Sequence, residues 1–315
     1  MFLKTRLTEL LGIKYPIILG AMAWVSMAPM VAAVSNAGGT GVIGTGSMPA
    51  EALRREIVRT RELTKNPFGV NLQMGAPNTA EQARVIVEEK PDFVTIGGGD
   101  PRVYFDDFKK AGIKVIAVVP NLKMARRMET LGADALVIEG MEAGGHIGQT
   151  TTMALMSMVL PEIRKTPVIV AGGFADGRGL AAALIMGASG IQMGTAFLLS
   201  KECEINQAVK QLIMKSDDTA TIMTGQTRNH GFRGIKNSFT ESYMKKETSG
   251  AALSELMEMG LGKYKLGLLE GDVQNGSVAA GQIIGMMNEE RTTKDIIESV
   301  MTEAEEILLN AHEIV

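Results

Sequence analysis

The sequence predicts an α/β protein built as a (β/α)8 TIM barrel, with a smaller helical insertion after the eighth strand. Short apolar runs rich in Val and Ile, bounded by Gly or Pro, start near residues 15, 41, 68, 93, 114, 135, 167 and 190, on average about 25 residues apart. Amphipathic stretches lie between these runs, as is typical of βα units with a parallel sheet. Eight such units favour a closed barrel over an open, doubly wound sheet.

Individual segments support this interpretation. Residues 115–119, 135–139 and 167–173 are almost continuously apolar, as expected of strands that are covered on both faces. The intervening helices are expected at residues 50–65, 79–90, 122–131 and 150–164, where apolar residues recur at helical spacing.

The pattern weakens after residue 200. Residues 201–271 are richer in charge and Met, and helices are expected at 202–214 and 251–259. The chain is expected to return through a small-residue helix at 276–287 and to end in an amphipathic helix at 292–314, capped by Thr292 or Thr293. We therefore expect a barrel domain formed by residues 1–200 and 272–315. Residues 201–271 would form a smaller domain that covers the active site.

Composition excludes several classes of function. The chain is 45% hydrophobic and 21% charged, which rules out intrinsic disorder, and a net charge of −3 gives no electrostatic case for binding nucleic acid or an anionic membrane. The lone Cys203 and three His residues predict neither a disulfide nor a metal site. The uncharged runs 15–50 and 179–200 are broken by Pro and Gly, so we expect a cytoplasmic protein without a membrane span.

Glycine-rich loops mark the ends of the last two predicted strands. Ala171, Gly172 and Gly173 follow the seventh strand, and Gly194 and Thr195 follow the eighth. These two loops hold a phosphate in many barrels, because glycines let backbone N–H groups approach its oxygens. Each glycine pair alone is compatible with an ordinary turn, whereas the two together favour a phosphate site.

The loop after the sixth strand provides a candidate acid–base group. His146 lies among glycines just beyond a strand end, and an imidazole whose pKa lies near neutrality can exchange a proton with a substrate. The alternative is a solvated loop histidine, which is how we interpret His230 and His312. Glu139 and Asn71 end their strands and can hydrogen-bond a ligand, or in the case of Glu139 simply lie at the surface.

Six segments carry a resemblance to a known family: residues 15–24, 140–153, 167–177, 190–197, 233–237 and 271–285. They resemble the flavin-dependent enoyl-acyl-carrier-protein reductase II of bacteria, which shares a superfamily with nitronate monooxygenase (2-nitropropane dioxygenase). The EAGGH sequence at 142–146 is common to both activities, whereas the continuations after His146 and the segments at 233–237 and 272–282 favour the reductase.

The resemblance implies a noncovalently bound FMN and NAD(P)H as the reductant. Gly172 and Gly173, near Ala171, would hold the phosphate with Gly194 and Thr195. The other cofactor contacts that it implies are Ala21, Met22, Ala23, Asn71, Glu139, Gly281 and Gln282. This chain has Gly20-Ala21-Met22 where the family usually has Gly-Gly-Met, which leaves the fine geometry of that loop open.

Two reactions fit these residues. In the first, hydride passes from NAD(P)H through the flavin to a trans-2-enoyl group on acyl carrier protein, in fatty acid biosynthesis, and His146 stabilises the thioester oxygen or helps to protonate the product. In the second, a small nitronate is oxidised with O2, and His146 acts as a base on the neutral nitroalkane. An inactive flavin-binding module would leave His146 unexplained. The family and the Met-rich insertion also predict a homodimer.

Overall fold

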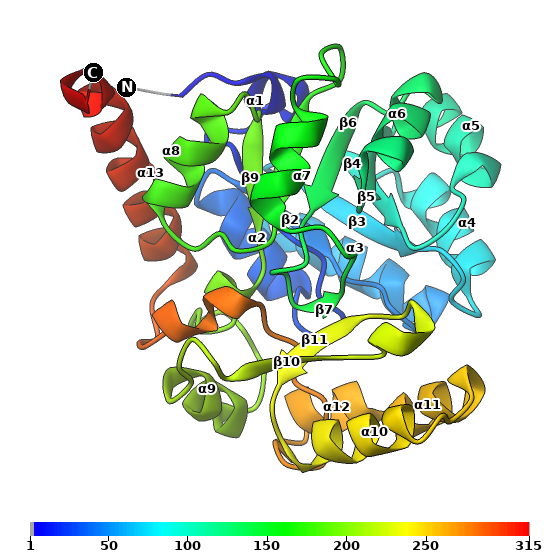
Figure 1. The fold of residues 1–315 in the computed structure, drawn as a ribbon. Coiled ribbons are helices and arrows are strands. Elements are labelled where there is room, and N and C mark those ends of the chain that lie inside the picture. Colours follow the sequence, from blue (N-terminus) through cyan, green and yellow to red (C-terminus); the bar gives the residue numbers. More distant parts are fainter. Residues whose placement is uncertain (1–2, 315) are drawn as a thin grey trace.

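The computed structural model describes residues 3–314 and contains a closed barrel of eight parallel strands (Figure 1). Each strand begins within two residues of its predicted start, so the predicted barrel is confirmed. The strands, in order around the barrel, are β1 (Ile17–Leu19), β2 (Thr40–Ile43), β3 (Gly69–Gln73), β4 (Phe93–Gly97), β5 (Lys114–Val119), β6 (Ala135–Glu139), β8 (Val168–Ala171) and β9 (Gly190–Met193).

Helices connect the strands and surround the barrel. The last helix packs against α8 and α2, and so fills the position after the eighth strand. Its predicted cap is confirmed, since the Thr292 side chain accepts a hydrogen bond from the backbone N–H of Asp295. These helices are α2 (Ala28–Asn36), α3 (Ala50–Leu63), α4 (Thr79–Glu89), α5 (Arg102–Lys110), α6 (Leu122–Thr130), α7 (Thr152–Val159), α8 (Gly177–Ile185) and α13 (Thr293–Asn310), which continues into η4 (Ala311–Ile314).

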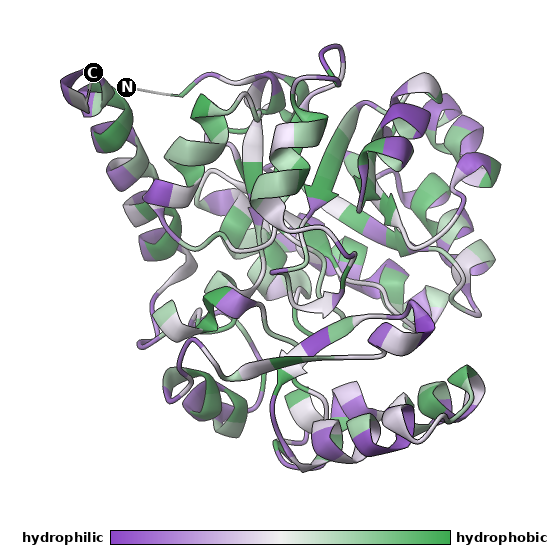
Figure 2. Ribbon diagram, viewed as in Figure 1, coloured by the Kyte–Doolittle hydropathy of each residue, from purple (hydrophilic) through white to green (hydrophobic). Residues whose placement is uncertain are grey.

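Two apolar layers stabilise the barrel. One lies between strands and helices, and the other fills the lumen with side chains such as Ile18, Phe93 and Ile169. Helix α1 (Arg6–Leu11) closes the amino-terminal end of the lumen with Leu7 and Leu11. Figure 2 shows the strands as largely hydrophobic and the outer helices as mixed. With one end closed, the carboxyl ends of the strands are left for a ligand.

The segment after η1 (Thr195–Phe197) is not purely helical. Residues 201–271, which we call the cap segment, contain a hairpin as well as helices, because two short runs of β-forming residues flank a glycine-containing turn. The hairpin strand β11 also pairs with β7 (Gly145–His146). The elements of the cap segment are α9 (Gln207–Met214), β10 (Thr221–Thr224), η2 (Gln226–Arg228), β11 (Phe232–Ile235), α10 (Ser238–Thr248), α11 (Leu253–Gly260) and α12 (Lys263–Leu268).

The helix predicted for residues 276–287 is wrong. Only η3 (Gln282–Met286) is helical there, and the rest runs as a loop. Its small residues serve close backbone approach instead: a Cβ added to Gly276 would lie 2.3 Å from the backbone nitrogen of Gly267.

No helix within residues 3–314 is long and apolar enough to cross a membrane. The uncharged run 15–50 divides into β1, α2 and β2, with the start of α3, as its Pro and Gly residues predict.

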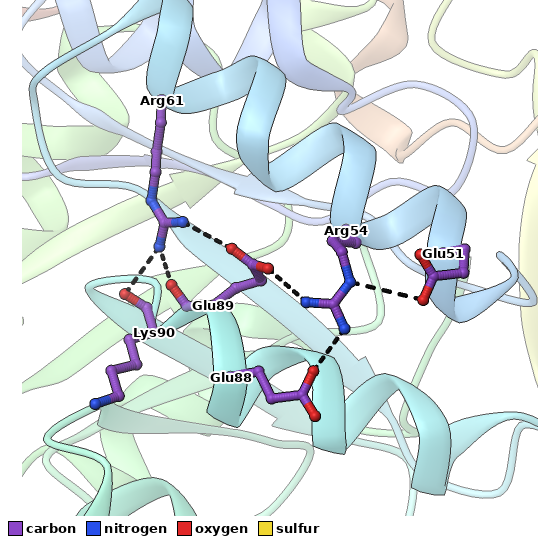
Figure 3. A network of polar contacts seen from close by, with 6 residues as sticks. All are labelled: Glu51, Arg54, Arg61, Glu88, Glu89 and Lys90. Atoms are coloured by element: carbon purple, nitrogen blue, oxygen red, sulfur yellow. Dashed lines mark hydrogen bonds and ion pairs between the residues drawn. The ribbon is translucent and has the colours of Figure 1, made fainter.

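A network of ion pairs joins α3 and α4 on the outer wall (Figure 3). Arg54 lies 2.5 Å from both Glu88 and Glu89, and Arg61 lies 2.9 Å from Glu89. These pairs hold the two helices together at the surface, where such interactions contribute little to stability.

Candidate active site

The carboxyl ends of the strands carry polar side chains that face the lumen. Glu139 pairs in register with Ala171, and Ala171 with Gln192, on three neighbouring strands. Ala171 belongs to the lumen cluster, so Glu139 and Gln192 point inward at the same level. On the opposite side, Asn71 accepts a hydrogen bond from the Thr95 hydroxyl at 3.0 Å. The predicted Asn71, Glu139 and Ala171 thus line one opening, and Gln192 is an addition that sequence analysis missed.

Glu139 carries an unusual acidity for a carboxyl group. Surrounding protein atoms desolvate it and raise its pKa to about 7. Within residues 3–314 its carboxyl group accepts no hydrogen bond that would favour the charged form. It can therefore act as a neutral hydrogen-bond donor or as a charged acceptor near neutral pH.

The glycine loops form a cradle of backbone. Gly172 and Gly173 have φ of 94° and 82°, conformations that favour glycine. Gly281 and Gln282, predicted cofactor contacts from near the end of the chain, lie beside these loops. Gly281 N–H donates to the Thr195 hydroxyl at 2.9 Å, and Gln282 N–H donates to the Glu142 carbonyl at 2.9 Å. The structure therefore brings three of the predicted loops to one place.

This cradle fits an anionic group such as a phosphate. A Cβ added to Gly172 would lie 2.8 Å from the Gly140 carbonyl oxygen, so a side chain is excluded there. In the described part of the chain, the backbone N–H groups of Gly173, Gly194 and Thr195 donate to no protein group. Free N–H groups beside glycines are the usual means of binding phosphate oxygens.

The loop after β1 closes over this cradle. Met22 N–H donates to the Ser26 hydroxyl at 2.8 Å, which fixes the turn. A Cβ on Gly194 would lie 3.3 Å from the Met22 sulfur, and one on Gly46 would lie 3.0 Å from the Ala23 Cβ. Ala21 packs against the lumen cluster. Met22 therefore lies near the end of the eighth strand, Ala23 lies against the loop after β2, and Ala21 lies over the lumen.

His146 is held by the cap segment rather than by the barrel alone. It pairs with Phe232 across the β7–β11 ladder, and the two rings meet edge to face with centroids 5.3 Å apart. Its Nε2 atom lies 3.2 Å from Nε2 of His230. The interpretation of His230 as an ordinary loop histidine is therefore wrong. His312 lies in η4 and contacts the Leu309 carbonyl, three residues earlier in the chain.

The acidity of His146 also differs from the expectation. Desolvation by the surrounding protein, reinforced by the neighbouring His230, lowers the pKa of His146 to about 4, although the residue is partly exposed to solvent. The ring is thus neutral at pH 7 and can donate one hydrogen bond and accept another. A neutral imidazole suits a role as hydrogen-bond donor to a developing oxyanion.

Further cap-segment residues complete this wall. Tyr264 of α12 meets Phe232 edge to face, with ring centroids 5.7 Å apart. Buried Glu247 of α10 accepts hydrogen bonds from the backbone N–H groups of Gly225 and Thr227, and so anchors the turn that leads to His230. The hairpin pattern around residues 221–235 was the one signal in the sequence that could have located His230 and Phe232.

The chain matches the family model for nitronate monooxygenase over residues 4–88 and 80–303. It is 32% identical to an octahydro-indene-carboxyl-CoA dehydrogenase of Mycobacterium tuberculosis, over 96% of this chain and 97% of the relative. It is also 35% identical to nitronate monooxygenase of Paraburkholderia phytofirmans, over 75% of this chain and 78% of that protein.

Among solved structures, FabK from Thermotoga maritima has a TM-score of 0.96 at 39% sequence identity, over 99% of this chain and 100% of that one. The similarity therefore extends through the cap segment as well as the barrel. With its barrel, its glycine cradle and its histidine at the mouth, the chain belongs to the nitronate monooxygenase family of flavin-dependent oxidoreductases.

Proposed function

We propose that this protein is an FMN-dependent, NAD(P)H-consuming reductase of trans-2-enoyl thioesters carried by acyl carrier protein. The observation that carries the proposal is the similarity to FabK, an enoyl-acyl-carrier-protein reductase II, along essentially the whole chain. The relative that covers 96% of this chain also has a name that specifies a thioester, a carboxyl-CoA. Both comparisons favour an acyl thioester as the substrate.

The predicted cofactor residues support FMN as the bound group. Free N–H groups at Gly173, Gly194 and Thr195 would meet its phosphate, while Gly281 and Gln282 would close that end. Met22 and its neighbours would lie against the ring system, with Asn71 and Glu139 at its polar edge. When bound, the flavin supplies the hydride transfer that protein side chains cannot perform.

His146 would act on the substrate carbonyl. Reduction at the β-carbon places negative charge on the thioester oxygen, and a neutral imidazole at the mouth can donate a hydrogen bond to that oxygen. The hydrogen bond with His230 occupies Nε2, while Nδ1 forms no hydrogen bond within residues 3–314 and is left for the substrate. His230 would act as a positioning residue that fixes the ring.

The test uses the purified yellow protein without oxygen. NADH or NADPH should bleach the flavin absorbance rapidly, and crotonyl thioester should restore it. The proposal is overturned if the bleached protein is not reoxidised by any enoyl thioester.

Nitronate oxidation is the second candidate, because the family model and several curated relatives are named for that activity. In this case NAD(P)H would fail to bleach the flavin, while an alkyl nitronate would support oxygen consumption in an oxygen electrode. The two reactions therefore give opposite results with the same preparation.

A further inference from the structure

A cavity of about 620 Å³ lies beside the two histidines. Its walls come from the loop that follows His146, the turn that contains His230, and the start of α6. Ile147 lines it directly after His146, and Asn229 lines it directly before His230. The cavity is therefore lined by the chain neighbours of both histidines, although the two imidazoles are not among its lining residues. Another cavity, of about 500 Å³, lies between α4 and α5, away from the strand ends.

The cavity of about 620 Å³ has a neutral lining that is rich in carboxamide side chains. Four side chains are amides, and none of the described residues that line it is charged; the amides are Asn121, Gln149, Gln226 and Asn229. Met141 and Ile147 add apolar surface between them. Such a wall fits a neutral chain in which methylenes alternate with amides.

Part of this amide chemistry is unused by the protein. Gln149 donates to the Asn229 side-chain oxygen at 3.2 Å, which leaves the Gln149 oxygen and the Asn229 amino group available. The Asn121 oxygen caps α6 by accepting from Met124 N–H, so its amino group is also available. The cavity thus presents both donors and an acceptor, which is what secondary amides require.

We propose that this cavity binds the pantetheine arm of the acyl carrier and leads the thioester to His146. The inference rests on the proposed function, since a nitronate has no such arm. Pantetheine is uncharged and combines methylenes, hydroxyls and secondary amides, which match the lining. A dinucleotide is a poor match, because its phosphates would find no cation among the described lining residues.

The arm can come from acyl carrier protein or from coenzyme A, and both share this chemistry. The test therefore begins with binding and needs no turnover. Butyryl-pantetheine, a saturated thioester that cannot be reduced at a double bond, is titrated into the flavin-loaded protein by calorimetry. We expect measurable binding by the parent protein, and absence of binding overturns the proposal.

Two variants test the amides separately. Asn229→Gly suits the left-handed backbone there (φ 53°), and Gln149→Ala removes its partner. Each should raise the Kd for butyryl-pantetheine about fivefold to tenfold, the effect of one lost hydrogen bond. The matched control Gln211→Ala, on the exposed surface of α9, should leave the Kd unchanged. An unchanged Kd in both cavity variants overturns the proposal.

Further measurements distinguish acyl carrier protein from coenzyme A as the source of the pantetheine, and distinguish failure of the cavity proposal from failure of the proposed function. Butyryl-CoA that binds no more tightly than butyryl-pantetheine, together with tighter binding of butyryl-acyl-carrier-protein, identifies the carrier protein as the source. If the protein binds these ligands but crotonyl thioester does not reoxidise its flavin, the cavity proposal stands and the proposed function is overturned. If the protein reduces crotonyl thioester but both variants bind butyryl-pantetheine as the parent does, only the cavity proposal is overturned.

Discussion

The Nε2 atoms of His146 and His230 lie 3.2 Å apart, although the two residues are 84 positions apart in the chain. A hydrogen bond between two imidazole nitrogens needs one donor and one acceptor, so the pair fixes a complementary set of tautomers. The neighbouring His230 also adds to desolvation in lowering the pKa of His146. The His146 imidazole at the barrel mouth is neutral at pH 7 as a result.

Replacing His146 tests its role in the reaction. His146→Ala should lower the rate of enoyl reduction about 10²–10³-fold, the usual effect of losing one hydrogen-bond donor to a developing oxyanion. Flavin content should stay normal, because the phosphate cradle lies on other loops. Single-turnover absorbance measurements separate the two half-reactions. If both keep parental rates, and nitronate oxidation does too, His146 is an ordinary loop residue.

Replacing His230 tests the coupling between the rings. His230→Ala removes the secondary cause that lowers the pKa of His146, so that pKa should rise from about 4 towards the ordinary value. The acidic limb of the kcat/KM profile should then move to higher pH, with a smaller loss of rate than in His146→Ala. A profile that keeps its acidic limb would show that His230 does not influence His146.

The glycine cradle can be tested through flavin content. Gly173→Asp or Gly194→Asp would place a carboxylate where free N–H groups should meet a dianionic phosphate, so both variants should be colourless but folded. Gly260→Asp is the control, because a Cβ there meets no atom within 4 Å. Circular dichroism checks the fold, and a full flavin spectrum in either cradle variant would place the phosphate elsewhere.

Glu139 should make the stability of the flavin-free protein depend on pH. Its pKa is about 7 when folded and near the ordinary 4.5 when unfolded, so folding binds a proton and stability falls as pH rises from 4.5 to 7. Glu139→Gln should therefore raise the free energy of unfolding by about 1–2 kcal/mol at pH 8, allowing for partial exposure. Urea titrations at pH 4.5 should show little difference, and equal stability at pH 8 would contradict the burial of the charge.

Glu247 should affect the rate of enoyl reduction indirectly, because it anchors the turn that positions His230. Desolvation raises its pKa, but the hydrogen bonds from Thr227 and Gly225 outweigh this effect, so its pKa lies below the ordinary value. Its stabilising contribution is therefore present at neutral pH and lost in acid. Glu247→Ala should cost about 2–4 kcal/mol of unfolding free energy and slow enoyl reduction, with flavin retained. Normal turnover would show that the turn does not need this anchor.

The barrel and the glycine loops at its strand ends could be predicted from the sequence, because both depend on local signals. Val- and Ile-rich runs mark the strands, and the glycines that follow them mark the cradle at Gly173 and Gly194. The histidine pair could not be predicted in the same way. His230 reaches His146 only through the ladder between β7 and β11, and β7 is just two residues long. Pairing at that range leaves no periodic pattern in the sequence.

Because of the ladder between β7 and β11, the orientation of His146 and the shape of the glycine cradle depend on different parts of the chain. His146 follows a barrel strand in the chain, but its ring is set by residues of the cap segment. Substitutions within 201–271 can therefore re-aim the imidazole while the glycine cradle stays intact. The position of the imidazole and the shape of the cradle can in this way change independently of each other.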